Sequence, residues 1–161
     1  MTKFTRDSAI GFLKAINEKI PADIKLNKYL LRALSKARIS IDEIVQEVVK
    51  REEALSTDET KAYDRERMEI IKEYALKGED GLPIVENDNV TIPQDVKDIV
   101  AQKLDNIYNL HNMGEAEEKR KEFVEFLKEE IEVDLVKITI DQLPDELDIQ
   151  TYQILSMFVE E

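Results

Sequence analysis

Four basic side chains near the N-terminus recur at a spacing that would let them act together. Steps of three, four and four residues separate them, so an α-helix would carry all four on one stripe. Cations in one line repel each other, and an acidic surface nearby is needed to offset them. The candidate partner-binding residues are therefore Lys25, Lys28, Arg32 and Lys36.

Three kinds of surface could neutralise this basic stripe. In order of preference they are the chain's own acidic segment at 115–130, an acidic face of another protein, and a phosphate backbone. The 161-residue chain has a formal charge of −13, and because residues 1–40 carry +6 the remainder carries −19. That negative field opposes the approach of nucleic acid and of anionic membranes. We expect contact with acidic protein, within the chain or on a partner, and no nucleic-acid or membrane partner.

The other reactive side chains fit structural roles better than catalytic ones. Without cysteine the chain has no thiol nucleophile and no zinc ribbon. Its one histidine, His111, shares a helical stripe with Leu104 and Tyr108, where an imidazole usually completes the edge of a core. We expect no catalytic residue, no metal site, no cofactor and no enzymatic activity. The carboxylates without EF-hand spacing read as turn and cap residues, namely Glu79, Asp80, Glu86, Asp88, Asp145, Glu146 and Asp148.

Helical periodicity dominates the first half of the chain. Apolar residues three and four positions apart predict a helix over 5–19, which Pro21 ends, and a long helix over 26–55. The long helix carries a seam that includes Ile41, Ile44 and Val48. A short break at 56–58 precedes another helix over 58–77, and short connections favour antiparallel neighbours. The sequence therefore predicts an elongated helical hairpin over 26–77.

The second half mixes short β-type runs with helices. Two runs within 82–92 flank a polar turn, helices are predicted over 95–111 and 115–130, and 131–140 alternates as a strand. Because a lone two-stranded hairpin is marginal in water, 82–92 and 132–140 are expected to share one sheet. Asp148 would cap a last short helix. The predicted fold is α+β and mostly helical: an elongated antiparallel helical hairpin (26–77), then a small antiparallel sheet and a short C-terminal helix (78–161), in a single domain, 1–161.

Several short motifs stand between residue 25 and the end of the chain. After a loose start at Lys25-Leu26-Asn27, they are Asp80-Gly81-Leu82-Pro83-Ile84, Glu132-Val133-Asp134, Lys137-Ile138, Leu143-Pro144 and Glu160-Glu161. In these motifs the chain resembles a family of small uncharacterised proteins of tailed phages that infect Gram-positive hosts. The resemblance implies a phage origin and association with other phage or host proteins, and it transfers no chemistry.

Two functional hypotheses follow. The first is a non-enzymatic, phage-encoded interaction protein, such as an adaptor, assembly helper or virion accessory, whose partner is another phage or host protein or a second copy of itself. The second is an acidic regulator that mimics nucleic acid and blocks a basic cleft on a host protein. The absence of a membrane-length apolar run and of a signal-type N-terminus predicts the host cytoplasm, with incorporation in the virion left open.

Overall fold

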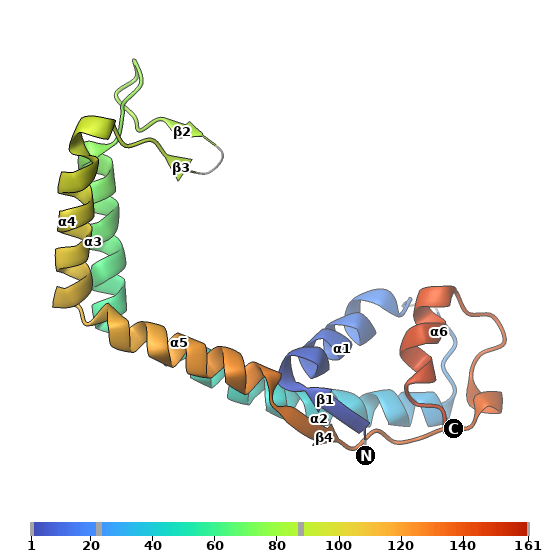
Figure 1. The fold of residues 1–161 in the computed structure, drawn as a ribbon. Coiled ribbons are helices and arrows are strands. Elements are labelled where there is room, and N and C mark those ends of the chain that lie inside the picture. The colour runs from blue at the N-terminus through green and yellow to red at the C-terminus, as the bar shows by residue number, and fades with distance from the viewer. Residues whose placement is uncertain (1, 22–23, 87–88, 161) are drawn as a thin grey trace. The chain divides into compact units, whose positions relative to one another are not determined.

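The computed structural model describes residues 2–21, 24–86 and 89–160. It is mostly helical with short antiparallel strand pairs, so the predicted α+β class is confirmed (Figure 1). The elements are β1 (Thr2–Thr5), α1 (Arg6–Lys19), α2 (Lys28–Glu53), α3 (Asp58–Tyr74), β2 (Val85–Glu86), β3 (Asn89–Val90), η1 (Gln94–Val96), α4 (Lys97–Leu110), α5 (Met113–Lys128), β4 (Glu130–Val133), η2 (Ile140–Gln142) and α6 (Ile149–Ser156).

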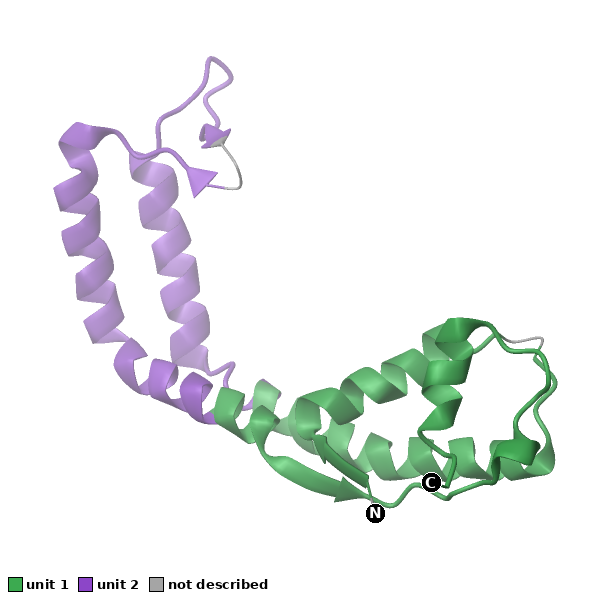
Figure 2. Cartoon of the chain, turned by 45° about the vertical axis from the view of Figure 1, so that its right-hand side comes forward, with its two compact units in different colours: residues 1–52, 123–161 green, residues 53–122 purple. Residues whose placement is uncertain are grey.

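The chain forms two compact units (Figure 2). Unit 1 comprises Met1–Glu52 and Phe123–Glu161, so it joins the two ends of the chain. Unit 2 is the continuous segment Glu53–Glu122. The basic stripe lies in unit 1 and His111 lies in unit 2.

Unit 1 contains a sheet that the sequence did not predict. Strand β1 pairs antiparallel with β4, with Thr2 opposite Val133 and Thr5 opposite Glu130. The expected partner of 132–140 was 82–92, and that prediction is wrong. Regular pairing also stops at Val133, and beyond it Ile138 makes an isolated parallel bridge to Val159. The segment after Val133 has no regular ladder of strand hydrogen bonds, and the burial of Leu135 and Ile138 holds it in place.

The core of unit 1 gathers side chains from helices at both ends of the sequence. Leu30 and Ile41 of α2 are fully buried, as are Ile16 of α1 and Phe158 after α6. The predicted seam of 26–55 is therefore an inward face, on which Ile44 is half-buried against the same cluster. An amphipathic helix becomes stable chiefly by burying such a face.

Side-chain caps set the starts of the helices of unit 1. The Thr5 hydroxyl accepts the backbone N–H of Ser8, and the Ser8 hydroxyl accepts that of Thr5, forming a capping box before α1. Asp148 accepts the backbone N–H of Thr151 at 2.9 Å before α6. The predicted helix over 5–19 and the predicted Asp148 cap are both confirmed, because capping chemistry is local in sequence.

Unit 2 is built on α3 packed against α4. The sequence predicts that 58–77 packs on 26–55 instead, but the structure assigns those two helices to different units. The partner of α3 is thus the helix that follows it, across the β2–β3 hairpin. Tyr63 and Tyr108 meet edge to face with ring centroids 6.2 Å apart. A short connection does not by itself choose the face on which a helix packs.

The hairpin predicted over 82–92 is present as β2 and β3, with Val85 opposite Val90. It is attached to the end of α3, because Leu76 donates its N–H to Thr91 O at 2.8 Å and accepts that of Ile84 at 2.7 Å. Gly81 adopts a φ of 76°, a backbone conformation that glycine tolerates best. The hairpin is a separate sheet from β1–β4.

Candidate functional site

The basic stripe lies on the first half of α2, on the side opposite the core. Asn27 Oδ1 accepts the backbone N–H groups of Tyr29 and Leu30, both at 3.0 Å, and so starts the helix at Lys28. Lys25 therefore precedes the helix and is not part of its surface. At about 100° per residue, Lys28, Arg32 and Lys36 lie roughly opposite the buried face of α2. All four cations are exposed, and the helical stripe contains three of them.

No acidic group of the described residues pairs with the stripe. Among residues 2–21, 24–86 and 89–160, none of the four cations forms an ion pair. The ammonium of Lys28 lies 5.0 Å from the ring centroid of its neighbour Tyr29. The intramolecular partner preferred from the sequence, the segment 115–130, is not found on the stripe, since its carboxylates pair elsewhere. Those pairs are Glu115–Lys119, Glu118–Lys121, Glu125–Lys128, Glu129–Arg6 and Glu130–Lys3.

Exposed apolar side chains accompany the cations. Leu31 is 54% exposed and Ile39 is 59% exposed. Arg32 and Tyr29 also line an open hollow of about 240 Å³ together with residues 136–139, Gln142 and Glu160, and Glu160 forms no ion pair with Arg32 among the described residues. A surface that combines cations with isolated apolar groups suits an acidic amphipathic partner better than a uniform phosphate backbone.

The second half of α2 has the opposite charge. Residues 28–38 contain four basic residues and no acidic one, whereas 39–47 contains three acidic residues and no basic one. Glu43 and Glu47 line an open hollow of about 410 Å³ together with Glu132 and Asp134. Within the described part of the chain, Glu43 forms no ion pair, while Glu47 approaches Arg6 and Arg51. The exposed face of α2 therefore carries a basic segment followed by an acidic segment.

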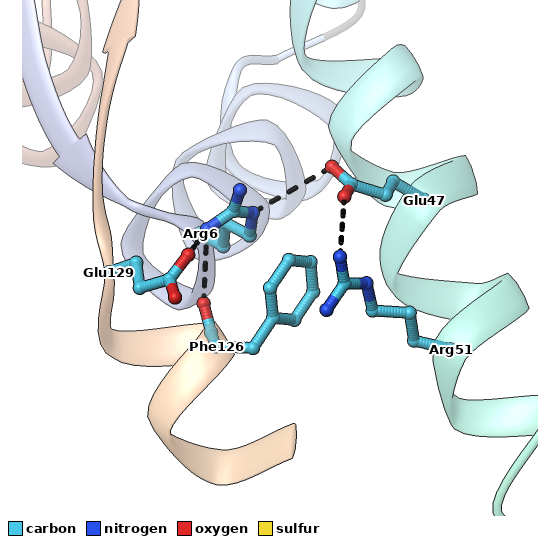
Figure 3. A network of polar contacts seen from close by, with 5 residues as sticks. All are labelled: Arg6, Glu47, Arg51, Phe126 and Glu129. Atoms are coloured by element: carbon cyan, nitrogen blue, oxygen red, sulfur yellow. Dashed lines mark hydrogen bonds and ion pairs between the residues drawn. The ribbon is translucent and has the colours of Figure 1, made fainter. Parts of the chain in front are cut away.

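A half-buried arginine, Arg6, contacts both the acidic part of α2 and the end of α5. The Arg6 side chain is 15% exposed and donates to Glu129 at 2.7 Å and to the Phe126 carbonyl at 3.2 Å. Figure 3 shows the Phe126 ring between two guanidinium groups, with Arg6 at 3.9 Å and Arg51 at 3.8 Å from its centroid. Sequence reasoning missed this cluster, because the contacts join residues about 120 positions apart and no local pattern marks them.

His111 occupies the edge of the α3–α4 pair, as the sequence predicts. Its side chain is 14% exposed, its ring meets that of Tyr63 edge to face, and Nε2 lies 3.2 Å from Glu66 Oε1. That distance allows an ion pair, but the geometry makes no hydrogen bond to Nε2 among the described residues. The contact joins two residues of unit 2.

An open hollow of about 350 Å³ lies beside His111, between the starts of α3 and α5. It contains the Glu115–Lys119 pair, whose hydrogen bond lowers the pKa of Glu115 and raises that of Lys119. Nearby, a hydrogen bond to Glu117 raises the pKa of Tyr108. Glu115 is therefore paired with Lys119, and Tyr108 with Glu117. In the described ranges no group of three His, Asp or Glu residues is arranged to hold a metal ion.

Of the carboxylates predicted to serve turns and caps, Asp80 and Asp148 have the expected roles, whereas Glu86 lies in strand β2. Asp80 Oδ1 accepts the N–H of Leu82 at 3.0 Å, which forms an Asx turn. Asp148 caps α6, and its pKa is lowered by the hydrogen bonds from the Thr151 hydroxyl and backbone. Asp88, and Glu161 of the phage-like motifs, lie outside the described residues.

The chain matches no protein-family model, no curated protein and no solved structure. Among the described residues, none of the helices has the length and apolar character needed to cross a membrane. Inference about function therefore rests on the geometry of the surface itself.

Proposed function

We propose that this chain is a non-enzymatic interaction protein that binds acidic protein surface through the basic face of α2, defined by Lys28, Arg32 and Lys36. The observation that carries the proposal is that these exposed cations have no acidic partner among the described residues. No ion pair among the described residues offsets their mutual repulsion, so an acidic partner gains binding energy there. The phage context, as adaptor, assembly helper or virion accessory, is proposed from the sequence resemblance alone.

The alternative of a nucleic-acid mimic is less well supported. A mimic needs carboxylates that remain free over an extended surface, as phosphates are. Along α5, the carboxylates of Glu115, Glu118 and Glu125 each lie within 2.9 Å of a lysine ammonium of the same helix. Paired carboxylates present a weaker and more mixed field to a basic cleft.

The test uses the full chain with the double variant Lys28→Glu, Arg32→Glu. The probes are a synthetic amphipathic peptide with glutamates on one face and leucines on the other, and a duplex DNA oligonucleotide. At about 150 mM salt we expect the unmodified protein to bind the peptide, and the double variant to bind it at least about tenfold more weakly. DNA retention should stay at background for both proteins, because the net charge opposes its approach.

A matched control carries the same change of charge on another helix of the same unit. Lys14 and Lys19 are exposed on α1, and the variant Lys14→Glu, Lys19→Glu should retain peptide binding. Folding should survive in the test variant, since a glutamate at position 28 favours the start of a helix. DNA binding that the test variant abolishes, or peptide binding that ignores the reversal, contradicts the proposal.

A further inference from the structure

The exposed face of α2 is complementary to itself. Arg32, Lys36, Ile39 and Glu43 follow one another in steps of four, three and four residues, so they form a seam along the helix. At about 100° per residue these positions lie within about 60° of one another, away from the buried face. The seam is basic at one end and acidic at the other, with the exposed Ile39 between them.

A two-fold axis pairs such a seam with its own copy. When two identical helices cross antiparallel, the basic end of each meets the acidic end of the other, and both contacts form at once. With the axis between Lys36 and Ile39, Arg32 of each copy faces Glu43 of the other. Ile39 of each copy then lies against the aliphatic stem of the opposite Lys36.

We propose that the acidic partner of the basic face is a second copy of this chain, bound through antiparallel α2 helices. This inference rests on the proposed function and names its partner. It accounts for features at both ends of the seam. Arg32 and Glu43 are both exposed and, in the described part of the chain, each is without an ion pair. Ile39 is 59% exposed at the position where the two copies would cross.

A heterologous acidic partner would explain only half of this surface. It would use the cations and leave without a role the hollow that Glu43 lines with three other carboxylates. In the two-fold pair, Lys28 of one copy also approaches Glu47 of the other, which lines that hollow. One helix face makes a small interface, so the dimer should dissociate on dilution and at high salt.

The test is sedimentation equilibrium of the full chain across a concentration series at about 150 mM salt. We expect a reversible monomer–dimer equilibrium. Arg32→Glu and Glu43→Arg should each raise the dissociation constant at least about tenfold, because each breaks two symmetric contacts. The double variant Arg32→Glu, Glu43→Arg restores both contacts with exchanged charges and should return the constant to within about threefold of the original.

A matched control exchanges charges on α1 instead. Lys14→Glu, Glu18→Arg and their double variant involve exposed residues four positions apart, and they should leave the dissociation constant unchanged. Orientation is tested separately, because the chain contains no cysteine. A single Ile39→Cys should cross-link between copies with a short bis-maleimide, and Asn17→Cys on α1 should not.

Three results would overturn the inference: a monomer at every concentration up to about 0.5 mM, a dimer that tolerates both single reversals, or a double variant that fails to recover. A monomer that still binds the acidic peptide through Lys28 and Arg32 would refute self-association and leave the proposed function standing. Loss of both activities would refute the two together.

Discussion

The two units differ in how completely they bury their apolar side chains. The seven largest fully buried side chains of the described residues all belong to unit 1, and Phe158, Ile16 and Leu30 head that group. In the described part of unit 2, the only buried side chains are those of Thr60, Ala75, Val100 and Met113. The larger apolar groups of α3 and α4, such as Ile70 and Ile107, remain half-exposed.

The smaller buried surface of unit 2 means that α3 and α4 need stabilising contacts outside a closed core. A pair of helices covers only one face of each, so edge contacts must supply what a closed core does not. In unit 2, Lys103 lies 4.7 Å from the Tyr74 ring centroid and 3.7 Å from Glu73, and the hydrogen bond with Tyr74 raises its pKa. Exposed contacts of this kind contribute little individually. We therefore expect unit 2 to open more readily than unit 1.

The largest expected effect compares matched core truncations in the two units. Ile41→Ala in unit 1 removes a side chain with no exposed surface and should cost about 3–4 kcal/mol. Ile107→Ala in unit 2 should cost about 1 kcal/mol, because the side chain is already half-exposed. Urea denaturation measures both values. Amide hydrogen exchange should be faster in α3 and α4 than in α1 and α2. Equal protection of the four helices would contradict the expectation that unit 2 opens more readily than unit 1.

The next effect concerns Arg6, which links α1 to the end of α5 in unit 1. Arg6→Ala should destabilise the chain by about 1–3 kcal/mol, because it removes two hydrogen bonds and one of the two guanidinium contacts with Phe126. Arg6→Lys should recover only part of the lost stability. A lysine ammonium lacks the planar, forked donors with which Arg6 reaches both the Glu129 carboxylate and the Phe126 carbonyl. Lys3→Ala is the control. Its ion pair with Glu130 is exposed on both sides and should contribute less than about 0.5 kcal/mol.

A smaller effect is expected at the joint between α4 and α5 in unit 2. Asn112 adopts a φ of 52°, a conformation that β-branched residues strongly resist. Asn112→Ile should cost about 1–2 kcal/mol, whereas Asn112→Gly should stay within about 0.5 kcal/mol, because glycine adopts this φ without strain. Thermal unfolding of both variants measures the difference. Equal losses would show that the amide contact with Glu115, and not the backbone, matters at this position.

The smallest effect separates the helix caps of the two units by pH. The pKa of Asp148 is lowered in the fold, relative to the unfolded chain, by the hydrogen bonds it accepts from the Thr151 hydroxyl and backbone. Its contribution to stability is therefore complete above the unfolded pKa and is lost as the pH falls through the folded pKa. Thr57 caps α3 with a hydroxyl that does not titrate in this range.

Melting temperatures between about pH 6 and pH 2.5 test this contrast. Asp148→Asn should lower the Tm at pH 6 and converge with the unmodified chain in acid, because the protonated aspartate also loses its charge. Thr57→Ala should lower the Tm by the same amount at every pH. If the Asp148→Asn difference did not shrink in acid, the hydrogen bonds to Thr151 would not depend on the carboxylate charge.

The sequence by itself determined the features that depend on neighbours along the chain. Helices over 5–19, 58–77 and 95–111 were predictable from apolar spacing, and Asp148 from the chemistry of caps. The turn role of Asp80 follows in the same way. Each of these features depends on residues within about four positions, a distance over which the chain has few alternatives.

Only the tertiary structure decided which elements meet. The strand at 130–133 found Thr2–Thr5 instead of 82–92, and α3 packed on α4 instead of on the long helix. Both pairings are decided by how much apolar surface they bury. Several other pairings of the same elements would also bury apolar surface, so the sequence pattern alone does not select one. The same holds for the candidate site. The spacing of Lys28, Arg32 and Lys36 was visible from the start, but whether the chain's own carboxylates neutralise them depends on where distant segments fold. Glu115, Glu118 and Glu125 of α5 pair with lysines three or four positions away on the same helix, and Glu129, just after α5, pairs with Arg6.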